Sequence, residues 1–148
     1  MALEHWLTDG SIKVHKPSRT EIQRLLAVAD RDLRDANVRG LSVDRRFATA
    51  YAAALQLATI PLRASGYRAS SSAGGHHWRT ISLLPTLMGE QQRARKVYLD
   101  SCRRARNEAD YDRVDVVSEE DLLELLEDTL EFRDDVLAWL AEKHPELR

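Results

Sequence analysis

The residues of this chain best suited to chemistry form one short polar cluster, "RRARNEADYD", at positions 103–112. In a helix, residues at i, i+3, i+4 and i+7 lie on one side. The guanidinium group of Arg106 can hold a phosphate through two parallel hydrogen bonds, and the amide of Asn107 can donate to another oxygen. Tyr111, one turn later, can stack on a base or donate its hydroxyl. The spacing therefore predicts an anion site on a helix face made of Arg103, Arg106, Asn107 and Asp110.

The same cluster also has a plainer interpretation. Arg106 and Asp110 stand four residues apart, which is the spacing of an ordinary ion pair on an exposed helix. Such pairs are common and contribute little to stability. On this interpretation Tyr111 packs over the end of the helix, and the cluster binds no ligand.

A second motif, "GGHHW", places His76 and His77 directly after two glycines. If a helix begins there, its first backbone N–H groups attract anions, and either imidazole can contribute to a phosphate site. The alternative is a role in capping and packing that helix. Adjacent residues on a helix point about 100° apart, and no cysteine or carboxylate stands at ligand spacing, so we expect no metal site.

Charge is distributed unevenly along the sequence, although the net charge is only −2. Nine arginines and lysines but two acids lie between Arg63 and Arg106, whereas ten acids and one arginine lie between Ser118 and Glu142. The row "RARK", at positions 93–96, can follow a nucleic-acid backbone or form the solvated face of a helix. The acidic segment is expected to be solvated, or to dock on a basic partner such as the "RARK" face of a second protomer.

Apolar residues that recur with the helical period predict five helices. The first begins after Ser18, which has the capping-box spacing to Glu21. The second is expected to have Asp44 as its N-cap and an alanine-rich face. The third spans "HHWRTISLLPTLMG" and ends near Gly89, the fourth spans "EQQRARKVYLDSCRRARNEADYD", and Ser118 caps the fifth.

These elements predict the fold class. The chain is expected to be all-α, with residues 18–148 forming one up-and-down bundle of about five helices. Residues 1–17 are interpreted as an irregular N-terminal arm. No strand is predicted, and "GYRASSSAGG", at positions 66–75, is interpreted as a flexible loop. A length of 148 residues allows one buried core.

Composition argues against several classes of protein. With 43% hydrophobic and 31% charged residues, the chain is expected to be neither disordered nor a membrane protein. No apolar run approaches the roughly 20 residues that span a bilayer, and the N-terminus lacks a signal-peptide pattern. The lone cysteine, Cys102, cannot form an internal disulfide and favours a cytoplasmic location. We expect no cofactor.

The order of these motifs resembles the HEPN superfamily. It runs from "AYAAALQLA" through "AGGHHWRTISLLP" and "RNEADYD" to an acidic last helix opened by "SEEDLLELLEDTLEF", over roughly residues 18–142. The similarity is greatest to small stand-alone members with an "ADYD" element. HEPN domains are helical bundles, often homodimers, of toxin–antitoxin and other defence systems. The resemblance implies a homodimer whose partner is RNA, a nucleotide, a nucleotidyltransferase-like protein or an antitoxin.

Active HEPN domains are metal-independent ribonucleases with an arginine followed, after four to six residues, by a histidine. The two protomers bring their motifs together across the dimer interface. Here the motif arginine falls on Arg106 and the polar residue after it on Asn107, but Tyr111 takes the histidine position. Histidine exchanges protons near neutral pH, whereas tyrosine, with a free pKa of about 10, does so only after a large shift.

The sequence leaves two classes of function open beside a purely structural role. One is a HEPN-like module that binds a nucleotide, an RNA or a partner protein without efficient cleavage. The other is a metal-independent endoribonuclease with a composite site at the dimer interface, in which a histidine of "GGHHW" can replace the missing one. The predicted catalytic residues are Arg106, Asn107 and Tyr111. The predicted ligand contacts are Arg103, Asp110, His76 and His77.

Overall fold

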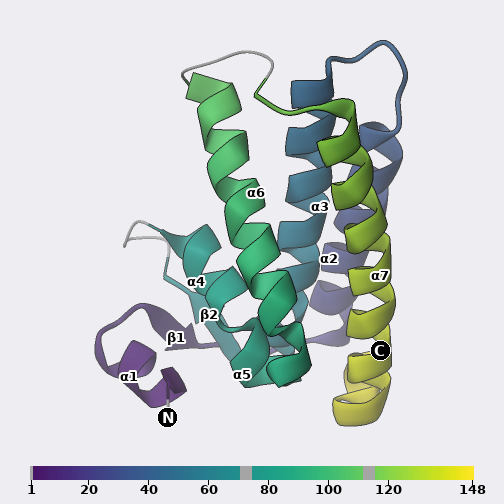
Figure 1. The fold of residues 1–148 in the computed structure, drawn as a ribbon. Helices are drawn as coiled ribbons and strands as arrows, with labels where there is room; N and C mark the ends of the chain where they lie inside the picture. Colours follow the sequence, from purple (N-terminus) through teal and green to yellow (C-terminus); the bar gives the residue numbers. More distant parts are fainter. Residues whose placement is uncertain (1, 71–74, 112–115) are drawn as a thin grey trace.

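Four long helices lying side by side make up the body of the protein (Figure 1). They are α2 (Arg19–Ala36), α3 (Val43–Ala64), α6 (Arg93–Tyr111) and α7 (Glu119–Lys143). The computed structural model describes residues 2–70, 75–111 and 116–148, and for residues 2 and 108–111 it describes the backbone alone. The prediction of an all-α helical bundle is confirmed. Within these ranges, no helix is both long enough and apolar enough to span a bilayer.

The central helix is α3, which contacts α2, α6 and α7. Its small alanines let neighbouring helices approach closely, and its larger side chains fill the spaces between them. The alanine-rich face expected from the sequence is buried along its whole length. It consists of Phe47, Ala50, Tyr51, Ala54, Ala58 and Leu62.

Serine side chains cap three of the long helices. Ser118 and Asp121 form the predicted capping box at the start of α7, with both bonds at 3.0 Å. The prediction of Asp44 as N-cap of α3 is wrong, because Ser42 caps that helix by accepting from the N–H of Arg45 at 3.2 Å. Asp44 lies instead in the first turn, where a carboxylate is favoured by the helix dipole.

The expected third helix is in fact two short helices, α4 (His76–Ser82) and α5 (Leu84–Met88). Pro85 stands in the first turn of α5, and it lacks the N–H that would bond to the carbonyl of Ile81 and continue α4. The 3₁₀ turn η1 (Glu90–Gln92) then leads into α6, and a second one, η2 (Pro145–Leu147), follows α7.

The N-terminal segment is more regular than the expected irregular arm. It contains α1 (Ala2–Thr8) and β1 (Ile12–Val14), which pairs antiparallel with β2 (Tyr67–Ala69). The absence of strands was therefore predicted wrongly, because runs of three residues are too short to show an alternating pattern. β2 also occupies the first part of the expected flexible loop, whose positions 71–74 lie outside the described residues.

One buried arginine joins α6 to α7. Arg95 is 9% exposed and donates to the carboxylate of Asp135 at 2.7 Å and to the amide oxygen of Gln92 at 2.8 Å. Its guanidinium group lies 4.8 Å from the centre of the Phe132 ring. The "RARK" row therefore does not form one solvated track, since Arg95 contacts the acidic helix of its own chain.

We expect Arg95→Ala to lower the free energy of unfolding by about 2 kcal/mol, because it removes the charge-assisted hydrogen bonds of a buried guanidinium group. Urea denaturation followed by circular dichroism measures this loss. Arg93→Ala is the matched control, because Arg93 is exposed and its ion-pair partner among the described residues is Glu90 of the preceding turn. Equal destabilisation by both substitutions would contradict the proposed role of Arg95.

Candidate phosphate-binding site

The two polar motifs of the sequence meet where α4 packs against α6. His76 and His77 begin α4, while Arg103 and Asn107 stand one helical turn apart on α6. All four side chains line one cavity of about 230 Å³, together with Gly75 and Trp78. The structure thus brings together residues that lie about thirty positions apart in the sequence.

A buried aromatic ring of α3 supports both walls of this cavity. Tyr51 is only 1% exposed, and its ring centre lies 6.3 Å from that of His77. From the other side, the guanidinium carbon of Arg106 lies 5.9 Å from the centre of the same ring. Arg106 also donates to the amide oxygen of Asn107 over a long 3.4 Å. Arg106 therefore stands beside the cavity, next to a residue that lines it.

Burial, aided by the charges around the cavity, keeps His77 neutral. Burial lowers its pKa from the usual value, and electrostatic interactions with His76, Arg106 and Arg103 lower it further. A neutral imidazole has one nitrogen that accepts a proton or a hydrogen bond. Burial raises the pKa of Tyr51, so the phenol stays protonated beside these cations. The site therefore combines fixed positive charge with a neutral base.

The start of α4 contributes less to the site than the sequence suggests. α4 has seven residues, so few peptide dipoles add along its axis. Its N-cap is Gly75, with φ of 79° and no side-chain cap. The attraction for an anion comes instead from arginine side chains. Arg103 is one of them, although its Nε donates to Asp100 at 3.0 Å and its charge is thus partly balanced.

Trp78 is a part of the site that the sequence reasoning missed. It lines the cavity, is 46% exposed, and stacks on Trp6 with ring centres 5.7 Å apart and planes at 19°. A supported and accessible indole is a suitable surface for stacking a base. Its place in "GGHHW" was the available signal, but its support comes from α1, which the sequence did not predict.

Two predicted residues cannot be placed in the same detail. Asp110 and Tyr111 are the last residues of α6, and their side chains lie outside the described residues. The backbone of α6 continues through both positions, one turn beyond Arg106 and Asn107. The ion pair between Arg106 and Asp110, and the predicted contact of Tyr111 with a ligand, stay predictions.

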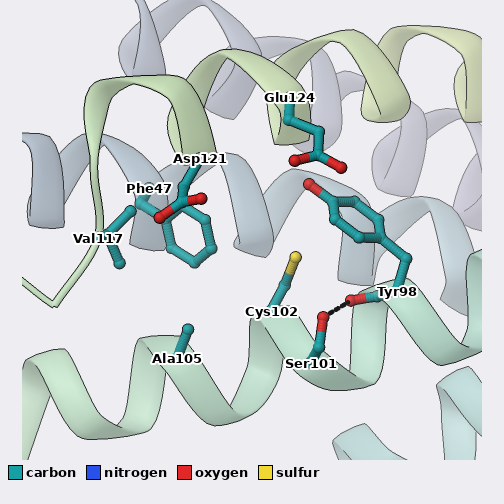
Figure 2. A pocket seen from close by; sticks show the side chains of 8 residues that line it. All are labelled: Phe47, Tyr98, Ser101, Cys102, Ala105, Val117, Asp121 and Glu124. Atoms are coloured by element: carbon teal, nitrogen blue, oxygen red, sulfur yellow. Dashed lines mark hydrogen bonds between the residues drawn. The ribbon is translucent and has the colours of Figure 1, made fainter.

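An acidic cavity lies on the opposite face of α6, between α6 and α7 (Figure 2). Its volume is about 260 Å³, and Figure 2 shows the sulfur of Cys102 pointing into it, with the carboxylates of Asp121 and Glu124 on the α7 side. Burial raises the pKa of the Cys102 thiol to about 11, so it is not a thiolate at neutral pH. The two carboxylates repel phosphate. This cavity is therefore the weaker candidate for chemistry or for anion binding.

Among the described residues, no group of three or more His, Cys, Asp or Glu side chains is placed to hold a metal ion. Comparisons with protein-family models, with curated proteins and with solved structures give no match. The candidate site therefore depends on the geometry of the α4–α6 cavity, and the HEPN resemblance stays a prediction.

We expect the imidazole of His77 to titrate below the reference value of 6.5 in the folded protein. The unfolded chain then binds more protons than the folded chain as pH falls through 6.5 and below. The contribution of His77 to stability therefore falls with decreasing pH in that window and is restored as pH rises. Histidine-selective NMR titration measures the midpoint, and His77→Gln assigns the signal. A midpoint above 6.5 would contradict the proposed environment.

Proposed function

We propose that the α4–α6 cavity binds a phosphate of a nucleotide or of an RNA strand. The observation that carries this proposal is the convergence of Arg103, Asn107, His76 and His77 on one cavity. Arg103 supplies charge-assisted hydrogen bonds, Asn107 supplies a neutral donor, and the imidazoles supply ring nitrogens. These are the groups that a phosphate requires from a protein in the absence of a metal.

Trp78 favours a ligand that carries a base over inorganic phosphate. The indole lines the same cavity as Arg103, and Trp6 supports it from α1. Stacking of one base on an aromatic side chain contributes about 1–3 kcal/mol and depends little on which base is bound. Together, a cation and an exposed aromatic ring define a site for single-stranded RNA or for a nucleotide.

The proposed role is therefore a HEPN-like helical domain that binds RNA or a nucleotide without efficient cleavage. The resemblance in the sequence supports a place in a toxin–antitoxin or other defence system, acting as a cytoplasmic homodimer with a protein partner. In that arrangement α6, which carries Arg106, would lie near the two-fold axis. The cavity within one chain already contains the groups that bind phosphate.

We expect Arg103→Gln to weaken binding of a fluorescein-labelled oligouridylate about tenfold, because one charge-assisted contact is removed. Fluorescence anisotropy at several salt concentrations measures the affinity. The negative slope of log K against log salt concentration should become shallower by about 0.7, the value for one phosphate contact on a single strand.

The matched control is Arg104→Gln. Arg104 is next in the sequence and pairs with the same Asp100, at 3.6 Å, but its side chain is 65% exposed and lies outside the residues that line the cavity. We expect this variant to bind like the native protein. If both variants lose the same affinity, binding is a non-specific effect of charge. If the native protein does not bind the RNA, the proposal is wrong.

The second candidate function is a metal-independent endoribonuclease. It is favoured by the position of His77 in the same cavity as Arg103, where burial and the nearby cations lower the pKa of the imidazole. A neutral imidazole beside cations can take the proton from a 2′-hydroxyl. The 2′-oxygen then forms a bond to phosphorus while the bond between phosphorus and the 5′-oxygen breaks. The 5′-oxygen leaves with a proton that a separate general acid donates. In this reaction the cationic arginines stabilise charge on the phosphate oxygens.

An RNA cleavage assay distinguishes the binding function from the ribonuclease. The oligouridylate is incubated with native protein, with His77→Gln and with Arg106→Ala, in the presence of a chelator. The binding function predicts background cleavage in all three samples. Rapid cleavage by the native protein alone, with loss in both variants, would contradict the binding function and support the nuclease.

A further inference from the structure

A second cavity adjoins the candidate site, and the two cavities share both histidines. Its volume is about 250 Å³, and it lies among α2, α3 and α4. His76 and His77 line both cavities, with ring centres 4.4 Å apart and planes at 82°. The histidine pair therefore forms a ridge between two hollows. The other residues around the second cavity are Leu25, Leu55, Gln56, Thr59, Arg63 and Thr80.

The second cavity differs from the first in charge. Its cation is Arg63, which donates to the carboxylate of Glu21 at 2.7 Å. His15 lies 2.8 Å from the same carboxylate, and the contacts with His15 and Arg63 lower the pKa of Glu21 against the effect of burial, so Glu21 is ionised. The charge of Arg63 is thus balanced within the chain. This cavity does not offer a second phosphate the net positive charge that it requires.

Its polar groups suit a neutral planar ligand instead. The Nε of Arg63 is buried and has no hydrogen-bond partner among the described residues. The amide of Gln56 provides both donors and an acceptor, while Leu25 and Leu55 provide apolar contacts. The hydroxyl of Thr59 donates to its own helix and leaves its oxygen as an acceptor. Acceptors and donors beside an aliphatic surface match the edge and the face of a nucleobase.

We infer that the ligand is a single-stranded oligoribonucleotide of at least two linked nucleotides, which crosses the His76–His77 ridge. This inference rests on the proposed function. One base stacks on Trp78, the phosphate that joins the two nucleotides lies against Arg103, and the second base enters the cavity of Gln56. A mononucleotide fills only one of the two cavities. The protein therefore binds the longer ligand more tightly and recognises the edge of its second base through hydrogen bonds.

The test compares two probes, uridine 3′-monophosphate and the dinucleotide UpU with a 2′-O-methyl group on its first ribose, which cannot be cleaved by attack of that oxygen. We expect the native protein to bind the dinucleotide about tenfold or more tighter in calorimetric titration, since the second base gains hydrogen bonds and apolar contacts in the cavity of Gln56. Gln56→Ala should remove most of this difference while leaving the affinity for the mononucleotide unchanged. Trp78→Ala should weaken both ligands.

Two further variants test whether the effect is specific to the hydrogen bonds of Gln56. Gln56→Leu nearly preserves the volume of the side chain and should behave like Gln56→Ala, which separates a lost hydrogen bond from a disturbed fold. Gln23→Ala, at an exposed position of α2, should bind both probes like the native protein. If mononucleotide and dinucleotide bind equally, or if the Gln56 variants weaken both alike, the inference is wrong while the proposed function stands. If the native protein binds neither probe, both are wrong.

Discussion

The candidate site depends on the position of a single buried ring. Tyr51 lies in the middle of α3, and two elements from distant parts of the chain rest on it: His77 from α4 and Arg106 from α6. Its hydroxyl is buried and has no hydrogen-bond partner among the described residues, so the phenol acts through packing and through the face of its ring. Residues of both α4 and α6 pack against this ring. The width of the cavity between the two helices therefore depends on a buried residue of the bundle core.

The helix α6 separates two regions of opposite character. Through Arg95, one of its faces joins the acids of α7, and the cavity on that side carries the carboxylates of Asp121 and Glu124. The opposite face presents Arg103 and Asn107 to the histidines of α4. A chain with a net charge of −2 can therefore keep a local cationic site, because ten of its 24 acids lie on α7, on the far side of α6. The net charge of the chain is therefore a poor guide to the charge around the candidate site.

The long helices and the common face of Arg103 and Asn107 could be predicted from the sequence, because both follow from a period of 3.6 residues. The pairing of β1 with β2 could not, since each strand has three residues and the partners lie more than fifty positions apart. The meeting of "GGHHW" with α6 is a tertiary contact, and periodicity carries no information about it. The ion pairs of Arg95 could not be predicted for the same reason. A row of basic residues has the same sequence pattern whether it faces solvent or the carboxylates of another helix. The break at Pro85, by contrast, could have been predicted, because proline cannot donate the bond that continues a helix.

The most direct test of the account asks where a bound nucleic acid lies on the protein. An oligouridylate containing 4-thiouridine is crosslinked to the native protein by near-ultraviolet light, and the modified peptide is identified by mass spectrometry. The account predicts crosslinks to the segment that contains His76, His77 and Trp78, and their loss in competition with unlabelled oligouridylate. Crosslinks confined to the exposed basic residues at the start of α6, with none in that segment, would contradict it.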